Sequence, residues 1–463
     1  MLTALQLYYL AVSTALFFYS LHRPQNALRA FVMAIASNIF PLAPVPYMDM
    51  DIARLGGLPL VYLPATAVGL ALAMRNGLHL PRRLLSLYVL AGIYLIYTLC
   101  NTVLLRGTSG ANIVYWMAWP LNFLLLIAAA ATASRFSEAF LNRVLLGCVW
   151  VLVAACVVGL ARYAVGIGSD ANFVPLMNRN GTVFLVALLF PLVFHVHATQ
   201  RKSRMWLAGC VSIIALCVVL TYSRSGLIGL MAGTLLYYWR FTLVGMLKLG
   251  AAVLVIGIFL QSGIAERSTE RLMAAGNTVQ AMLHGQEVDR SVGDHNRVRL
   301  VNSAIATAKE HFWFGTGLGM QNYREGLTRA GLGNVTSKSH NFYLSYFTEL
   351  GLVGFLLLLA ILQRIYAHLP SLGSHQRAFR VSFLVTALMM TMNEYILLPE
   401  LWLLMGLLMG AACRRTALMP AAQAKRPAAY RHGRATTGSA AQHEPGVSGS
   451  AAPSTCLTGG IHG

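Results

Sequence analysis

The stretch Thr221-Tyr222-Ser223-Arg224-Ser225-Gly226 separates two apolar runs, WLAGCVSIIALCVVL (206–220) and LIGLMAGTLLYY (227–238). Such runs predict consecutive helices that cross a membrane, and the arginine between them is the exception. An ionisable group at membrane depth costs about 3 kcal/mol, so it is a functional-site candidate by default. The guanidinium of Arg224 cannot lose its proton, and its planar fork suits phosphate. We therefore expect Arg224 to meet an anion at the membrane edge.

The composition extends the same pattern over most of the chain. Of the 463 residues, 57% are hydrophobic and only 11% are charged, whereas a soluble domain carries about 25% charged residues. The apolar runs are continuous and do not alternate with polar positions, so each span has to be an α-helix. The sequence therefore predicts an all-α, polytopic membrane bundle.

Twelve segments are expected to span the membrane. They are 2–20, 57–74, 84–105, 112–133, 144–166, 182–198, 205–222, 225–239, 241–262, 341–363, 378–394 and 399–413. A further apolar run, 27–45, is interrupted by prolines and is expected to be interfacial or re-entrant; if it spans instead, there are thirteen helices. The expected division is nine helices in 1–262, a long loop at 263–340, the last helices in 341–413, and a tail at 414–463.

Basic residues predict which side of the membrane each connection faces. The net charge of +20 lies largely in short loops such as 200–204 and in the tail, as topology signals do, so it does not indicate nucleic acid. These loops and the tail are expected in the cytoplasm, and the loop 263–340 outside it. That loop is long enough to be functional and has helical patterning over 297–311. The tail has too little apolar content to fold and is expected to be disordered.

No metal or cofactor site is expected. Most of the cysteines lie in or at the ends of apolar runs without metal-ligand spacing, which is typical of small core residues. The chain has no HExxH sequence or Walker loop. The glycines of the G-x-G-x-G run at 315–319 are expected to form a turn, since no strand precedes them.

Polar and charged residues collect at the outer membrane boundary from four separate stretches. They are Arg179 and Asn180, Tyr222 and Arg224, Arg297 and Arg299, and His340 and Asn341. Positive charge just outside the membrane runs against the topology bias, so it needs an explanation. Several arginines around the pyrophosphate of a lipid head group would bind that donor and stabilise the charge on its leaving group.

His340 is the expected general base. A neutral histidine can take a proton from an attacking hydroxyl near pH 7, and the start of the helix that follows it favours an anion. Asn341, Ser345 and Glu349 recur every four residues, so they share a helix face that could orient the histidine or the acceptor. Each residue also has a simpler interpretation: Arg299 as a solvated, snorkelling side chain, His340 as part of a helix cap, and Glu349 as a bond between helices.

Three stretches resemble the bacterial O-antigen ligase and polymerase superfamily. They are Thr221 to Gly226, RVRLVNSAIATAKEHFWFGTGLG (297–319) and SHNFYLSYFTELGLVG (339–354). The first is similar to the family's serine–arginine motif, the second to its arginine, amphipathic helix and glycine turn, and the third to its His–Asn helix start. Phe312 stands where proline is common in the family, and Val301 where tryptophan is common, but the charged positions are intact.

The resemblance implies an inner-membrane glycosyltransferase with a periplasmic active site. It implies an inverting, metal-independent transfer of a glycan from undecaprenyl pyrophosphate, with His340, Arg297 and Arg224 as catalytic residues. Within the superfamily a ligase uses lipid A–core as acceptor, a polymerase uses another lipid-linked repeat, and a third branch glycosylates protein. The single long loop favours the ligase. A transporter that only binds the head group is the alternative from another class, but it would place its ionisable residues at the bilayer midplane.

Overall fold

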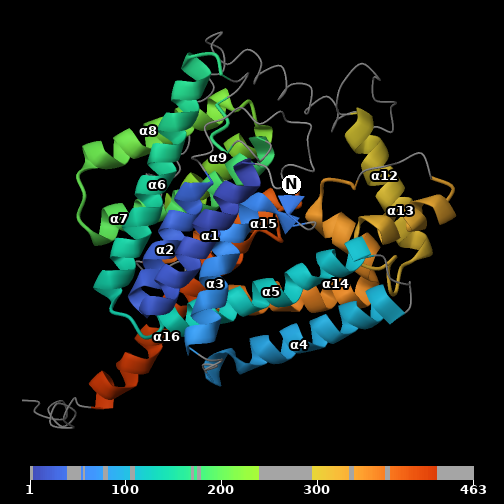
Figure 1. Cartoon of the computed structure of the whole chain (residues 1–463), viewed down its shortest axis with the longest axis horizontal. Coiled ribbons are helices and arrows are strands. Elements are labelled where there is room, and N and C mark those ends of the chain that lie inside the picture. The colour runs from blue at the N-terminus through green and yellow to red at the C-terminus, as the bar shows by residue number, and fades with distance from the viewer. Residues whose placement is uncertain are drawn as a thin grey trace, which may run out of the picture. The chain divides into compact units, whose positions relative to one another are not determined.

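The computed structural model describes residues 4–38, 54–55, 58–76, 82–104, 110–167, 171–174, 179–238, 295–332, 338–370 and 376–424. Residues 1–416 form one compact unit, and 417–463 form another. The first unit is a bundle of helices, as the sequence predicts (Figure 1). The predicted all-α fold class is confirmed.

The elements follow one another in this order. The helices are α1 (Ala4–His22), α2 (Pro24–Ser37), α3 (Leu63–Asn76), α4 (Leu85–Leu99), α5 (Gly110–Ala133), α6 (Glu138–Ala164), α7 (Arg179–Thr199), α8 (Arg204–Leu220), α9 (Arg224–Tyr238), α12 (His295–Glu310), α13 (Met320–Arg329), α14 (Phe342–His368), α15 (Arg377–Met389) and α16 (Pro399–Ala424). The short elements are η1 (Leu60–Tyr62), η2 (Arg82–Leu84), the π-helical η3 (Cys100–Leu104), and the antiparallel pair β1 (Arg54–Leu55) and β2 (Leu58–Pro59).

Each predicted span within the described residues overlaps a helix, although α15 ends at Met389, before the predicted end at 394. The span at 241–262 lies outside the described residues. Six of the described helical stretches are long and apolar enough to cross a membrane: Ala4–His22, Leu85–Val103, Asn112–Ala133, Glu138–Ala164, Arg179–Thr199 and Phe342–His368. The predicted run 27–45 contains most of α2, and its remainder from residue 39 lies outside the described residues. Helix α16 continues past the predicted boundary at 413, to Ala424. The rest of the tail lies outside the described residues.

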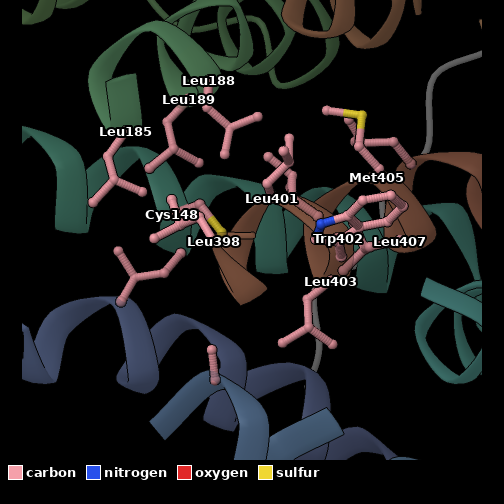
Figure 2. Packing of buried hydrophobic residues seen from close by; sticks show 14 of the residues in the cluster. Cys148, Leu185, Leu188, Leu189, Leu398, Leu401, Trp402, Leu403, Met405 and Leu407 are labelled. Carbon is pink, nitrogen blue, oxygen red and sulfur yellow. The ribbon is translucent and has the colours of Figure 1, made fainter. Parts of the chain in front are cut away.

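Helix α7 is the centre of the first unit, because nearly all of its residues from Gly181 to Val196 are buried. Figure 2 shows its leucines Leu185, Leu188 and Leu189 near the start of α16. Helix α9 packs beside α7 through glycines. A Cβ atom added at Gly226 would lie 2.9 Å from the Cβ of Val183. Small residues on one helix face let two backbones approach closely, which is how membrane helices associate.

Helix α14 is broken in its third turn. Gly351 has φ 64° and ψ −174°, so the chain leaves the helical conformation there and resumes it afterwards. A turn at residues 312–317 fills the break. Four backbone hydrogen bonds join the two segments: Thr316 N to Thr348 O (2.9 Å), Gly317 N to Glu349 O (2.8 Å), Leu352 N to Phe312 O (2.8 Å) and Val353 N to Trp313 O (3.3 Å). The turn thus pairs the backbone groups that the break would leave without partners.

The end of helix α4 holds the same turn from the other side. The hydroxyl of Tyr97 donates to the carbonyl of Leu350 at 2.6 Å, and the amide of Asn101 donates to the carbonyl of Phe314 at 2.6 Å. The close approach requires glycine, because a Cβ atom added at Gly315 would lie 2.3 Å from the carbonyl oxygen of Glu349. The predicted glycine turn is therefore a structural joint between the loop and a membrane helix.

The joint makes Gly351 sensitive to any side chain. In Gly351→Ala the new Cβ atom would lie 2.4 Å from backbone atoms of 313–314, at a φ that L residues rarely adopt. We expect a loss of stability of about 2–4 kcal/mol, measured as a lower midpoint of thermal unfolding in detergent. Gly92→Ala is the matched control, because a Cβ atom there would meet nothing within 4 Å. Equal midpoints for the two variants would show that the break can relax without cost.

Candidate functional site

Two of the predicted motifs lie side by side at the starts of neighbouring helices. Arg179 is the first residue of α7 and Arg224 is the first residue of α9. The Ser223 hydroxyl donates to the side-chain oxygen of Asn180 at 3.1 Å, and it also accepts from the backbone N–H of Gly226 at 3.4 Å. Ser223 therefore caps α9 and joins the two motifs in one contact.

The third motif meets the first two through residues 389–395, which run from the last residue of α15 into its connection to α16. This segment is called the 389–395 connection. Three contacts show this: Phe342 N donates to Met390 O at 2.9 Å, the side chain of Met389 lies against Gly229 of α9, and the rings of Tyr395 and Phe184 are 5.5 Å apart. Phe342 is the first residue of α14, and Phe184 lies in the second turn of α7. The starts of α7, α9 and α14 therefore converge on one connection.

This convergence makes the region electropositive. A helix N-terminus carries the equivalent of about half a positive charge, because its first amide groups have no partners within the helix. Three such ends meet here, and two of them begin with an arginine whose side chain is partly buried, Arg179 and Arg224. An anion is the ligand that this arrangement suits.

Two residues in the predicted motifs have strained backbones. Among the described non-glycine residues, a positive φ occurs only at Arg201, Tyr222 (51°) and His340 (55°). This conformation costs a bulky residue of order 1–3 kcal/mol and is found most often at functional sites. The Tyr222 hydroxyl lies 2.8 Å from that of Tyr163. The imidazole of His340 is exposed to solvent.

Asn341 fixes the backbone just after His340. It is the N-cap of α14, and its side-chain oxygen accepts from the backbone N–H of Leu344 at 3.1 Å. A side-chain cap of this kind pairs one of the helix's free amide groups. His340 therefore stands directly before a well-defined helix start, as the sequence predicts.

The predicted helix of the long loop is present as α12, and it packs along the first part of α14. The Thr348 hydroxyl donates to the carbonyl of Ala304 at 3.2 Å. Figure 1 shows α12 and α13 together beside α14 and α5. Arg299 is exposed, which agrees with its interpretation as a solvated side chain. The side chain of Arg297 lies outside the described residues, so its position relative to Arg224 stays a prediction.

Glu349 lies in a buried ion pair that the sequence did not indicate. Its side chain is 0% exposed and that of Lys338 is 7% exposed, and Lys338 Nζ is 2.5 Å from Glu349 Oε1. Lys338 also donates to the hydroxyl of Tyr115 at 3.1 Å. Burial lowers the pKa of Lys338, but the carboxylates of Glu349 and Glu394 outweigh it and hold that pKa above its ordinary value. Lys338 is therefore protonated at neutral pH.

A second carboxylate, Glu394, was also missed. The Ser345 hydroxyl donates to Glu394, and the hydroxyls of Ser345 and Ser339 are 2.8 Å apart. The available signals were weak: a lysine two residues before the His–Asn pair, and an acidic residue at the end of the predicted span 378–394. All three side chains of the predicted face, Asn341, Ser345 and Glu349, thus bond groups of the protein itself.

Chemically, the region offers cations and a proton acceptor. Arg179 and Arg224 can meet an anion at the helix starts, and the exposed imidazole of His340 can accept a proton. Within the described ranges, no three His, Cys, Asp or Glu side chains gather as a metal-binding group.

Residues 209–359 match the family model described as O-antigen ligase. No curated protein matches the chain. The matched segment contains Arg224, Arg299, Lys338, His340 and Glu349, and it includes all three stretches that carry the sequence resemblance. Together with the apolar helices of the bundle, the match supports a multi-pass membrane enzyme of the ligase and polymerase type. Over this segment, about a third of the chain, the protein is similar to the O-antigen ligase family.

Proposed function

We propose that the protein is an O-antigen ligase of the Gram-negative inner membrane. It transfers a glycan from undecaprenyl pyrophosphate to lipid A–core on the periplasmic side. One observation carries the proposal: three helices begin around the connection 389–395, with Arg179, Arg224 and His340 at or just before their starts. That is where an anionic donor and a proton acceptor are both needed.

The donor's pyrophosphate would lie against the helix starts. The amide ends of α7 and α9 and the guanidinium groups of Arg179 and Arg224 supply positive charge from fixed positions, and Arg297 is proposed to join them from α12. When the glycosidic bond to the pyrophosphate breaks, the leaving group gains negative charge. Contacts with that charge strengthen in the transition state, so they lower the barrier as well as bind the donor.

The acceptor would approach from the solvent side of His340. Its hydroxyl attacks the anomeric carbon opposite the pyrophosphate, a new C–O bond forms, and the bond to the phosphate oxygen breaks with inversion. The proton of the hydroxyl passes to the imidazole of His340. Undecaprenyl pyrophosphate leaves with the bonding electron pair, and the arginines neutralise it without a metal.

The exposure of His340 supports this assignment over Glu349. The imidazole is open to a large acceptor, whereas the carboxylate of Glu349 is fully buried against Lys338. The cations also sit at the ends of helices. A transporter would place them at the midplane, so transfer at one membrane face is the better explanation.

Reconstitution tests the reaction directly. Purified protein in liposomes, given undecaprenyl-pyrophosphate glycan and lipid A–core, should yield a glycan-extended lipid A–core band on a gel, with EDTA present. Product formed only when a second lipid-linked repeat is supplied would identify a polymerase. Head-group movement across the bilayer without a new bond would identify a transporter. Loss of product in EDTA, restored by magnesium, would show that the arginines are not the main neutralisers.

The arginines should differ in importance. Arg224→Lys keeps the charge but loses the planar fork, so a bidentate contact predicts a loss of about 10-fold in transfer rate, and Arg224→Ala about 100-fold with weaker donor binding. Arg299→Ala is the control, because that side chain is exposed; it should stay within about twofold. Initial rates and donor affinity measure both. A mild Arg297→Ala together with an inactive Arg299→Ala would show that the predicted anion contact within α12 is misplaced by half a helical turn.

His340 should be needed for the chemical step and not for binding. His340→Asn removes the imidazole, yet asparagine tolerates the positive φ of this position. It should lower the transfer rate by about 100- to 10,000-fold and leave undecaprenyl pyrophosphate binding nearly unchanged. His340→Ala should show the same loss plus some backbone strain. Near-normal turnover of His340→Asn would reduce the histidine to a backbone role before the helix cap.

A further inference from the structure

We infer that the buried ion pair of Lys338 and Glu349 is a positioning device for His340. It fixes the chain just before the histidine and so holds the imidazole where the acceptor hydroxyl arrives. The inference rests on the proposed function, because it takes His340 to be the base.

The ion pair holds the chain segment just before His340 in place through several contacts of the Lys338 amine. Lys338 is two residues before the histidine, and its amine has partners on two helices. It lies 2.5 Å from Glu349 in α14 and 3.1 Å from the hydroxyl of Tyr115 in α5. The amine also stands over the Tyr115 ring, 4.6 Å from the centroid, and 5.8 Å from the centroid of Tyr346. The hydroxyls of Tyr115 and Tyr346 are 2.8 Å apart, so the two tyrosines that contact the amine are also bonded to each other.

A second set of hydrogen bonds holds Ser339, the residue between Lys338 and His340. The Ser339 hydroxyl lies 2.8 Å from that of Ser345 and accepts from the backbone N–H of Asn341 at 3.3 Å. Ser345 is tied in turn to Glu394. Lys338, Ser339 and Asn341 are thus all fixed to groups in α5, α14 or the 389–395 connection. His340 is the one residue from 338 to 341 whose side chain is exposed.

The backbone of His340 explains why such anchoring is required. A histidine at φ 55° is held in a sparsely populated region, and such residues keep that conformation only when their surroundings determine it on both sides. Lys338 and Ser339 fix the backbone before His340, and the Asn341 cap fixes the backbone after it. If the backbone before it is released, the residue can relax toward negative φ, and the imidazole then turns away from its place.

Stability does not explain the pair well. Burying two charges in a membrane protein is costly, and a buried ion pair can be replaced by apolar groups with little loss or even a gain in stability. Such pairs are best understood as fixing one arrangement among several. Here the arrangement that they fix is the approach of the chain to His340.

The test removes both charges together, since removal of one would leave the other buried without a partner. In the double variant Lys338→Met with Glu349→Gln, the maximal transfer rate should fall at least about 10-fold. Affinity for undecaprenyl pyrophosphate, measured by titration, should stay within twofold. The matched control is Glu400→Gln. Glu400 is also buried (1% exposed) and is bonded by Asn38 at 3.0 Å; because this partner follows α2 and no hydrogen bond of the Glu400 side chain among the described residues involves 338–349, the variant should keep the normal rate.

Adding His340→Asn to the double variant distinguishes a failure of this inference from a failure of the proposed base. If the pair acts through His340, the double variant should lose little or nothing more when His340→Asn is added, because both changes disable the same step. A folded double variant with normal maximal rate, while His340→Asn is inactive, overturns the inference alone. A His340→Asn protein with normal rate overturns the proposed base first. Independent, multiplying losses would assign the pair a role of its own and not one through His340.

Lys338→Arg keeps the test decisive if the double variant does not fold, as judged by its thermal midpoint. Arginine keeps the charge but has a wider, planar head that cannot reproduce the 2.5 Å contact and the ring geometry together. We expect a lower maximal rate with unchanged donor affinity. An unchanged rate in folded Lys338→Arg overturns the inference.

Discussion

The backbone pairing between the broken helix α14 and the turn at 312–317 is the constraint on which the candidate site depends. Inside a membrane, an unpaired backbone group costs several kcal/mol, so a helix can be interrupted only where other chain supplies the partners. Here the turn does so, with Tyr97 and Asn101 of the α4 region supporting it. The break at Gly351 separates the first part of α14, which begins at Phe342, from the rest of the helix. That first part carries the cap after His340 and the carboxylate that binds Lys338.

Charge is distributed in two ways around this framework. Lys338 and Glu349 are buried together, so their charges neutralise each other and serve the geometry of the protein. Arg179 and Arg224 stand at helix starts and are only partly buried, so their charge adds to that of the helix ends. A membrane protein keeps ionisable groups at such a cost only where they have a task. We therefore propose different tasks for the two groups of cations, positioning for Lys338 and anion binding for the arginines.

Much of the helical framework could be predicted from the sequence, because membrane helices are defined by local apolar runs and the period of α12 is local too. The sequence predicted that Asn180 and Ser223 lie at the same membrane boundary, but not that their side chains form a hydrogen bond. The break in α14 was not predictable, since residues 350–358 are as apolar as an unbroken helix would be, and only the docked turn explains the positive φ of Gly351. Lys338 and Glu394 were missed for a similar reason. Their partners are 11 and 49 residues away in sequence, so no local pattern marks them.

Glu349 takes part both in the backbone pairing with the turn and in the ion pair beside His340. Its backbone carbonyl accepts from Gly317 of the turn, and its side chain binds Lys338 beside His340. Any displacement of the turn therefore removes a backbone partner inside the membrane helix and disturbs the anchor of the histidine at the same time. The turn cannot act as a freely moving lid, because opening it would leave the carbonyls of Thr348 and Glu349 unpaired in an apolar environment. Access for a large acceptor must come instead from the open side of His340, which is where the imidazole is exposed.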